Sequence, residues 1–228
     1  MKKILSTIIA LVMIVMCIVP VDVFASEKQT TVNRYNVVFV IDASTSMKYS
    51  DKNDNRFEAT DLFLGMLANS GNYVGTVIFN GNIKATDIKD IDGNSAKKEI
   101  SKAIRNNKLA ADTDIGGALL KATDMLKNNG NKNLPSIIIL LSDGNTDFDE
   151  KKQIDKSKQN KETALENARD NGYSIYTVSL NSNGKADAKE LKAISKATKG
   201  GLFEEVNDAK DLKDVFDNTT VVGVPANK

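Results

Sequence analysis

The sequence predicts an α/β protein with a doubly wound, mostly parallel six-stranded sheet, helices on both faces and one antiparallel edge strand. Three observations predict this fold class. Short apolar runs alternate with amphipathic stretches along the chain, as in βα units. Several of these runs, VVFVI and SIIILL among them, lack the alternating polar positions of a half-exposed strand, so both of their faces are expected to be covered. One polar segment does alternate, which is typical of a strand at the edge of a sheet.

The strands are placed by these runs. The apolar runs predict strands at Asn36–Ile41, Tyr73–Phe79, Ser136–Leu141, Ser174–Leu180 and Leu202–Val206. The polar segment NIKATDIKDI follows the second strand after Asn80-Gly81, a dipeptide that favours tight hairpins. We therefore expect this segment to pair antiparallel with the second strand.

The helices are expected between the strands. A helical repeat of apolar residues predicts a helix that packs on the sheet through Ala59, Leu62, Phe63, Met66 and Leu67. Further helices are predicted at Ser95–Asn106, Ile115–Asn128, Lys161–Asn171, Asp187–Lys199 and Ala209–Phe216. The charged segment Asp147–Lys161 is expected to form an exposed loop or a helix face.

The first 25 residues have the pattern of a secretory signal. Lys2 and Lys3 precede an apolar run from Ile8 to Val19, and small residues follow up to Ala25. The run is about half of the roughly 20 residues that a membrane-spanning helix needs, which favours a signal peptide. We expect a signal peptide at 1–25, a polar segment at 26–34, one domain at 35–218 and a tail at 219–228, in a secreted or surface-associated protein.

Composition excludes several kinds of site. Removing Lys2, Lys3 and Asp22 with the signal leaves 29 basic and 29 acidic residues, a balance that implies no nucleic-acid partner. The chain has no histidine, and its only cysteine, Cys17, lies within the expected signal. Zinc, haem, a Ser-His-Asp triad and a Cys-His pair are therefore excluded. Any metal must be held by oxygen, which suits magnesium, calcium or manganese.

Oxygen-bearing side chains follow the predicted strands at three places. The first strand leads into Asp42, Ser44 and Ser46, spaced two residues apart. Thr113 stands just before a predicted helix, and Asp143 follows the strand SIIILL within Ser-Asp-Gly. Because ligands bind beyond the carboxyl ends of the strands in a doubly wound sheet, these side chains are expected to meet around a small cation.

Three motifs, FVIDASTSM, DTDIGGAL and LLSDGNTD, occur in this order. Together they resemble the three loops of a von Willebrand factor type A (VWA) domain, and the resemblance covers roughly Tyr35 to Phe216. One difference is Thr45, where many bacterial relatives have glycine.

The resemblance implies a Rossmann-like VWA fold and a complete metal-ion-dependent adhesion site (MIDAS). It implies Ser44 and Ser46 as direct ligands and Thr113 as a direct or water-bridged ligand. Asp42 and Asp143 would act mostly through water. Mg²⁺ is the expected ion, with Mn²⁺ or Ca²⁺ as alternatives.

Each motif taken alone has a purely structural interpretation. Serine and aspartate after a strand commonly cap a helix or form a turn, and Thr113 alone would be explained as a helix cap. The combination at successive strand exits favours the metal site. Two segments that begin like calcium-binding EF-hand loops, at Asp51 and at Asp143, lack the glycine and the glutamate that such loops require.

These features predict a bacterial binding module without enzymatic activity. Hydroxyl ligands would leave the charge of the ion partly uncompensated, so that an acidic side chain of a protein ligand could complete its shell. We expect a monomer with no membrane span after cleavage of the signal. A metal-assisted hydrolase and a subunit of a larger extracellular assembly remain alternatives. Ser95 and Lys98 match the S-x-x-K pattern of some hydrolases, but Ser95 is better explained as a helix cap.

Overall fold

A single six-stranded sheet forms the centre of the computed structural model, which describes residues 34–181, 183–184 and 186–207. The strands are β1 (Asn36–Asp42), β2 (Asn72–Phe79), β3 (Ile83–Ile91), β4 (Ser136–Ser142), β5 (Ser174–Leu180) and β6 (Leu202–Val206). Their order is β3-β2-β1-β4-β5-β6, and only the β2–β3 pair is antiparallel. The predicted fold class, including its antiparallel edge strand, is confirmed.

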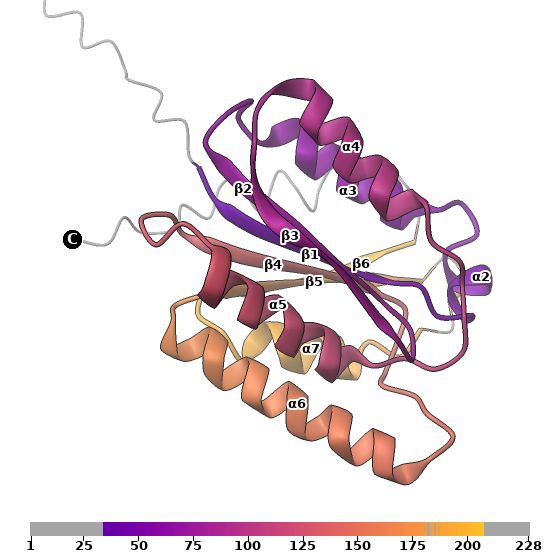
Figure 1. Ribbon diagram of the computed structural model, residues 1–228. Coiled ribbons are helices and arrows are strands. Elements are labelled where there is room, and N and C mark those ends of the chain that lie inside the picture. The colour runs from indigo at the N-terminus through magenta and orange to yellow at the C-terminus, as the bar shows by residue number, and fades with distance from the viewer. Residues whose placement is uncertain (1–33, 182, 185, 208–228) are drawn as a thin grey trace, which may run out of the picture. The chain divides into compact units, whose positions relative to one another are not determined.

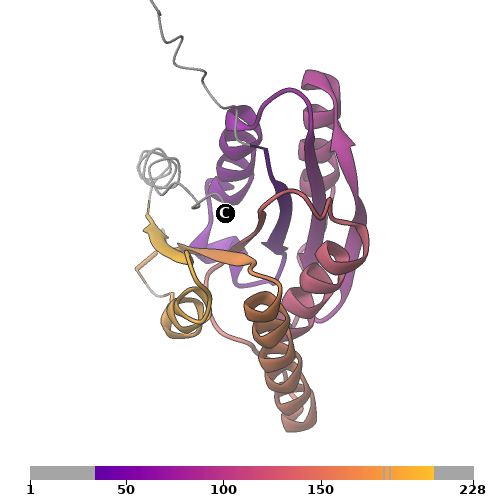
Figure 2. The same ribbon diagram turned by 90° about the vertical axis from the view of Figure 1, so that its left-hand side faces the viewer.

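Helices cover both faces of this sheet. They are α2 (Met47–Ser50), α3 (Asn55–Met66), α4 (Gly93–Arg105), α5 (Ile115–Asn129), α6 (Lys151–Asp170) and α7 (Lys189–Lys196). The helices α3 and α4 lie on one face, while α5, α6 and α7 lie on the other (Figure 1). Figure 2 shows α5 and α6 side by side in the second layer.

The apolar run of β1 serves both layers. Val37, Phe39 and Ile41 belong to the core beneath α3 and α4, while Val38 and Val40 belong to the core beneath α5, α6 and α7. All five side chains are buried. Since successive side chains of a strand point to opposite faces, a central strand needs apolar residues at every position.

The helix α3 is rotated relative to its predicted orientation. Leu62 and Met66, expected to face the sheet, are 46% and 44% exposed. Its buried stripe instead includes Arg56, whose guanidinium lies 2.5 Å from the carboxylate of Asp51. This ion pair allows a charged residue into the stripe, which a search for apolar periodicity alone does not find. Phe63 does face the sheet, where its ring packs edge-on against that of Phe39 at 5.6 Å.

Other helix boundaries also differ from the predicted ones. The helix α6 begins ten residues early, because its first half is mostly exposed and carries little apolar periodicity. The helix α7 is shorter than predicted, and the one-turn helix α2 was not expected. Asp92 is the N-cap residue of α4, so Ser95 lies inside that helix and its interpretation as the cap was wrong.

Some predictions concern residues outside the described part of the chain. These are the signal peptide at 1–25, nearly all of the polar segment at 26–34, the helix at Ala209–Phe216 and the tail at 219–228. Among the helices that the structure does describe, none combines the length and the apolar character that crossing a bilayer requires.

A close contact between α5 and α6 fixes the start of α5. The Gly116 N–H donates a hydrogen bond of 3.1 Å to the hydroxyl of Ser157, a residue that is 1% exposed. A Cβ atom at Gly116 would lie 1.7 Å from the carbonyl oxygen of Ser157. Only glycine permits this approach, which holds the first turn of α5, directly after Thr113, against α6.

We predict opposite effects for two glycine-to-alanine substitutions in helices. Gly116→Ala should lower the free energy of unfolding by about 1–3 kcal/mol, because the new methyl group forces α5 and α6 apart. Gly65→Ala in α3, where a Cβ would meet nothing within 4 Å, should raise it by up to about 1 kcal/mol. Urea denaturation measures both values, and equal shifts for the two variants would contradict this account of the contact.

Candidate metal centre

The three predicted loops meet at the carboxyl ends of β1 and β4, beside α2 in Figure 1. The segment before α5 joins them through backbone hydrogen bonds. The Ala110 N–H donates to the Ala43 carbonyl at 3.0 Å, and Thr113 exchanges two hydrogen bonds of 2.7 and 3.1 Å with Asp147. The backbone therefore brings three stretches that are distant in the sequence to one edge of the sheet.

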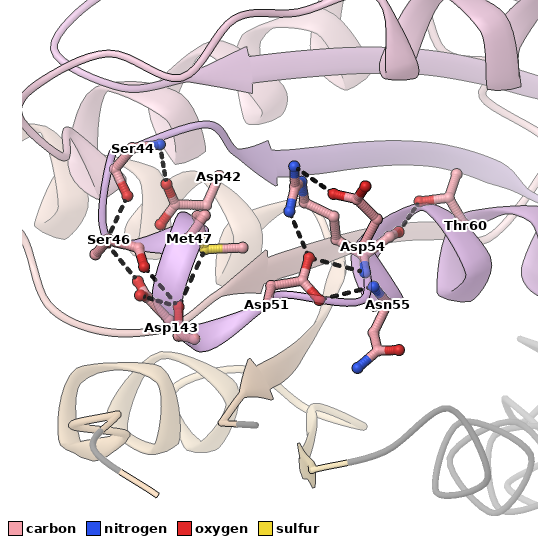
Figure 3. Close-up of polar contacts among 11 residues, drawn as sticks. Asp42, Ser44, Ser46, Met47, Asp51, Asp54, Asn55, Thr60 and Asp143 are labelled. Atoms are coloured by element: carbon pink, nitrogen blue, oxygen red, sulfur yellow. Dashed lines mark hydrogen bonds and ion pairs between the residues drawn. The ribbon is translucent and has the colours of Figure 1, made fainter. Parts of the chain in front are cut away.

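Four of the five predicted site residues are joined by hydrogen bonds. The hydroxyls of Ser44 and Ser46 lie 2.9 Å apart, and the Ser46 hydroxyl donates to Oδ1 of Asp143 at 3.1 Å (Figure 3). Oδ1 of Asp42 accepts a bond of 2.7 Å from the Ser44 N–H. Its Oδ2 accepts a bond of 2.5 Å from the hydroxyl of Ser142 in β4. The side chains from β1 and β4 thus form one network.

Thr113, the fifth predicted residue, is 6% exposed and lines a cleft of about 800 Å³ together with Ser46 and Asp143. Its hydroxyl makes no hydrogen bond to any residue that the structure describes. The helix-cap alternative fails, because Asp114 is the N-cap residue of α5 and accepts a bond of 2.8 Å from the Gly117 N–H. Because this hydroxyl has no partner within the described part of the chain, it is available as a ligand.

The residues present fit a hard divalent cation. The candidate donors are three hydroxyls and two carboxylates, all of them oxygen, as magnesium, manganese and calcium prefer. Neutral hydroxyls thus outnumber carboxylates among these candidate donors. Within the described residues there is no group of three or more acidic side chains placed to hold a metal.

Two acidic side chains at the site are buried without a basic partner in the described structure. Asp42 is fully buried and Asp143 is 8% exposed. The pKa of Asp42 is raised to about 6, mainly by burial and to a smaller extent by the charge of Asp143, against the opposing effect of the hydrogen bonds from Ser142 and Ser44. A bound cation would offset the unfavourable burial of these carboxylates.

Ser50, in α2, is a member of the hydrogen-bond network around Asp143 that the sequence analysis missed. It is 2% exposed, and its hydroxyl donates a short hydrogen bond to Oδ2 of Asp143. The same hydroxyl lies 3.1 Å from the Ser46 carbonyl. Ser50 follows Ser46 by four residues, so the one-turn helix brings the two together. Predicting α2 would have identified it.

The chain after α2 is fixed by a buried ion pair (Figure 3). The carboxylate of Asp51 accepts a bond of 2.7 Å from the Asn55 N–H and one of 2.5 Å from the guanidinium of Arg56. These contacts hold α2 against the start of α3. They also occupy the carboxylate with which the calcium-loop interpretation of this segment begins.

Comparison with known proteins identifies the family of this fold. Residues 36–218 match the family model of the von Willebrand factor type A domain. No curated protein sequence gives a significant match.

Similar solved structures include a von Willebrand factor type A protein from Catenulispora acidiphila (TM-score 0.66, 19% identity, 82% of this chain and 42% of that one). The pilus adhesin SpaC from Lactobacillus rhamnosus GG gives a TM-score of 0.61 at 14% identity, over 85% of this chain and 31% of that one. Proximal thread matrix protein 1 from the mussel byssus, described with a zinc-occupied MIDAS motif, gives 0.61 at 18% identity, over 82% and 45%.

At these identities the structural similarities show the fold, and this chain spans less than half the length of each of the three proteins. The family model, by contrast, covers most of the chain, including the loops that carry Asp42, Thr113 and Asp143. The chain therefore belongs to the von Willebrand factor type A domain family.

Proposed function

We propose that this chain is an exported bacterial binding protein that binds an acidic group of a protein ligand through a divalent cation. We expect this cation to be Mg²⁺. The cation would be held by Asp42, Ser44, Ser46, Thr113 and Asp143. One observation carries the proposal. Thr113, whose hydroxyl makes no hydrogen bond to any described residue, lines the same cleft as Ser46 and Asp143, and the Ser46 hydroxyl is hydrogen-bonded to both Ser44 and Asp143.

The hydrogen bonds indicate different roles for the carboxylates and the hydroxyls of the site. Asp42 already accepts bonds from the Ser44 N–H and the Ser142 hydroxyl, and Asp143 accepts from Ser46 and Ser50. Both carboxylates are thereby oriented as acceptors behind the hydroxyls. The bound ion would supply positive charge that neutral hydroxyl ligands do not cancel. A carboxylate from a partner would then form a charge-assisted contact in a partly dried cleft.

The comparisons support an adhesion-type role. SpaC is a pilus adhesin, and the mussel protein carries zinc at its MIDAS motif. By analogy we propose a secreted or surface-associated location, with the signal removed after Ala25, and a monomeric binding domain.

We also propose that the chain is not an enzyme. Ser95 and Lys98, the residues of the S-x-x-K pattern, are both exposed on α4, and no hydrogen bond joins them in the described structure. A catalytic serine needs a base within hydrogen-bond reach, so this pair offers no nucleophile. Metal-assisted hydrolysis and membership of a larger assembly are distinguished by the ligand-binding experiment below.

Removal of the Ser50 hydroxyl should weaken metal binding. In Ser50→Ala, Asp143 loses the donor that fixes its Oδ2, so the affinity for Mg²⁺ should fall about tenfold. The matched control is Ser195→Ala near the end of α7, which removes an equally buried hydroxyl that donates to the Lys192 carbonyl. It should cost about 1 kcal/mol of stability but leave the Mg²⁺ affinity unchanged. Isothermal titration calorimetry gives the affinities and urea denaturation the stabilities. A similar affinity loss in both variants would show that Ser50 acts only on stability.

Ligand capture should depend on both the metal and the carboxylates of the ligand. The mature chain should retain proteins from a surface extract with Mg²⁺, and lose them with EDTA or after the carboxyl groups of the extract are blocked as amides. Thr113→Val removes only the candidate ligand hydroxyl and should reduce capture at least tenfold, whereas Thr163→Val, at an exposed position on α6, should not.

Capture that persists with EDTA or with blocked carboxyl groups contradicts the proposal. Turnover of ester, peptide or phosphate substrates that disappears in Thr113→Val would favour a metal-assisted hydrolase. Retention of one stoichiometric partner through the same ion, surviving gel filtration, would favour a subunit of an assembly.

A further inference from the structure

The cleft beside the candidate metal centre is larger than one carboxylate requires. Its volume of about 800 Å³ is within the range of pockets that enclose ligands of tens of atoms. Beyond the candidate ligands, the connection after β1 contributes Tyr49 and Lys52 to its lining. The connections after β4 and β5 contribute Asp147 and Asp187. A ligand that reaches the metal centre therefore also meets these side chains.

The part of the lining after β4 and β5 is acidic. Asp147 and Asp187 are both exposed, and neither forms an ion pair within the described residues. A hydrogen bond from the Lys189 N–H, with a second from the Asn145 side chain, holds the pKa of Asp187 below its usual range. The carboxylate of Asp187 is therefore ionised at neutral pH and available to a cation.

The loop that carries Asp147 is held in place by both neighbouring helices. The backbone N–H and the hydroxyl of Thr146 lie 2.7 and 3.1 Å from the carboxylate oxygens of Glu190 in α7. Lys161 in α6 forms an ion pair of 2.8 Å with the same carboxylate. Asp147 itself is paired through its backbone with Thr113. The backbone of Asp147 is thus fixed relative to Thr113, which reduces the entropy lost when a ligand binds there.

The basic charge in the cleft comes from a different loop than the acidic charge. Lys52 is the one basic side chain among the described residues that line the cleft, and it comes from the same connection as Tyr49, which is 60% exposed. A ligand with only acidic side chains would be repelled by Asp147 and Asp187. A basic side chain in this part of the cleft would instead form charge-assisted contacts with the acidic lining.

We propose that Asp147 and Asp187 select the ligand: the cleft takes a protein segment in which a lysine or arginine lies within a few residues of the acidic residue bound at the metal. The inference rests on the proposed function, since the metal centre must bind the acidic residue first. Within it, Asp147 and Asp187 are specificity-determining residues and have no part in holding the ion.

Synthetic peptides test this selection. Acetylated, amidated peptides would contain one glutamate and one lysine separated by one, two or three glycines, and matched peptides would carry glutamine in place of lysine. Each is titrated into the isotope-labelled mature chain with Mg²⁺ at low salt and followed by NMR. The best lysine peptide should bind about fivefold more tightly than its glutamine match, as two exposed ion pairs allow.

Variants assign the preference to the two residues. Asp147→Asn combined with Asp187→Asn should bind lysine and glutamine peptides equally, with the affinity for the glutamine peptide retained. Asp124→Asn combined with Asp170→Asn changes the net charge by the same amount at exposed positions on α5 and α6, and should keep the fivefold preference.

The outcomes separate this inference from the proposed function. Binding of neither peptide, or binding that is unchanged by EDTA, overturns the proposed function. Mg²⁺-dependent binding of both peptides with equal affinity overturns only the selection of a basic residue. A preference for lysine that survives in the Asp147 and Asp187 double variant also overturns it.

Discussion

The hydrogen bond from the Ser142 hydroxyl to Asp42 is the contact on which the candidate site depends. It joins the carboxyl ends of two neighbouring parallel strands and fixes one oxygen of a fully buried carboxylate. The other oxygen of Asp42 binds the Ser44 N–H and so sets the turn that places Ser44 and Ser46 opposite Asp143. The burial of Asp42 is unfavourable by itself, as its raised pKa indicates, and this cost falls at the place where a cation would offset it.

Support for this arrangement comes from two directions. Behind β1, the buried pair of Asp51 and Arg56 holds α2, and α2 carries the Ser50 hydroxyl to Asp143. Behind β4, the Glu190 carboxylate holds the loop that pairs with Thr113. The side chains that would contact a metal are therefore held in position by neighbouring residues that would not contact it. This is the usual relation between metal ligands and the residues around them.

The sequence predicted the sheet well because β1 and β4 are central strands whose apolar runs are unbroken. It predicted helix positions less well where exposure or charge hides the period. Most residues in the first half of α6 are exposed to solvent. The buried stripe of α3 contains Arg56, whose charge is tolerated there because Asp51 forms an ion pair with it. Neither fact can be inferred from hydrophobicity, because both depend on tertiary contacts.

The candidate site, too, could be predicted only in part from the sequence. Asp42, Ser44, Ser46, Thr113 and Asp143 could be assembled from motifs at strand ends, and whether they bind a metal stays a prediction. Ser50 could not be found this way, because its position depends on a single helical turn that has no periodicity to detect. For Thr113 the structure removes the helix-cap alternative, because Asp114 is the N-cap residue of α5, and its role as a ligand stays a prediction.

The outer edge of β3 has a consequence for the behaviour of the chain in solution. Along this strand Lys84, Asp87, Lys89 and Asp90 are all exposed, and only Ile88 and Ile91 are buried. Another strand adding to this edge would have to strip water from ammonium and carboxylate groups of both signs before its backbone could pair. This edge of the sheet, on the side of β3 that faces away from β2, therefore resists pairing with a strand of another molecule.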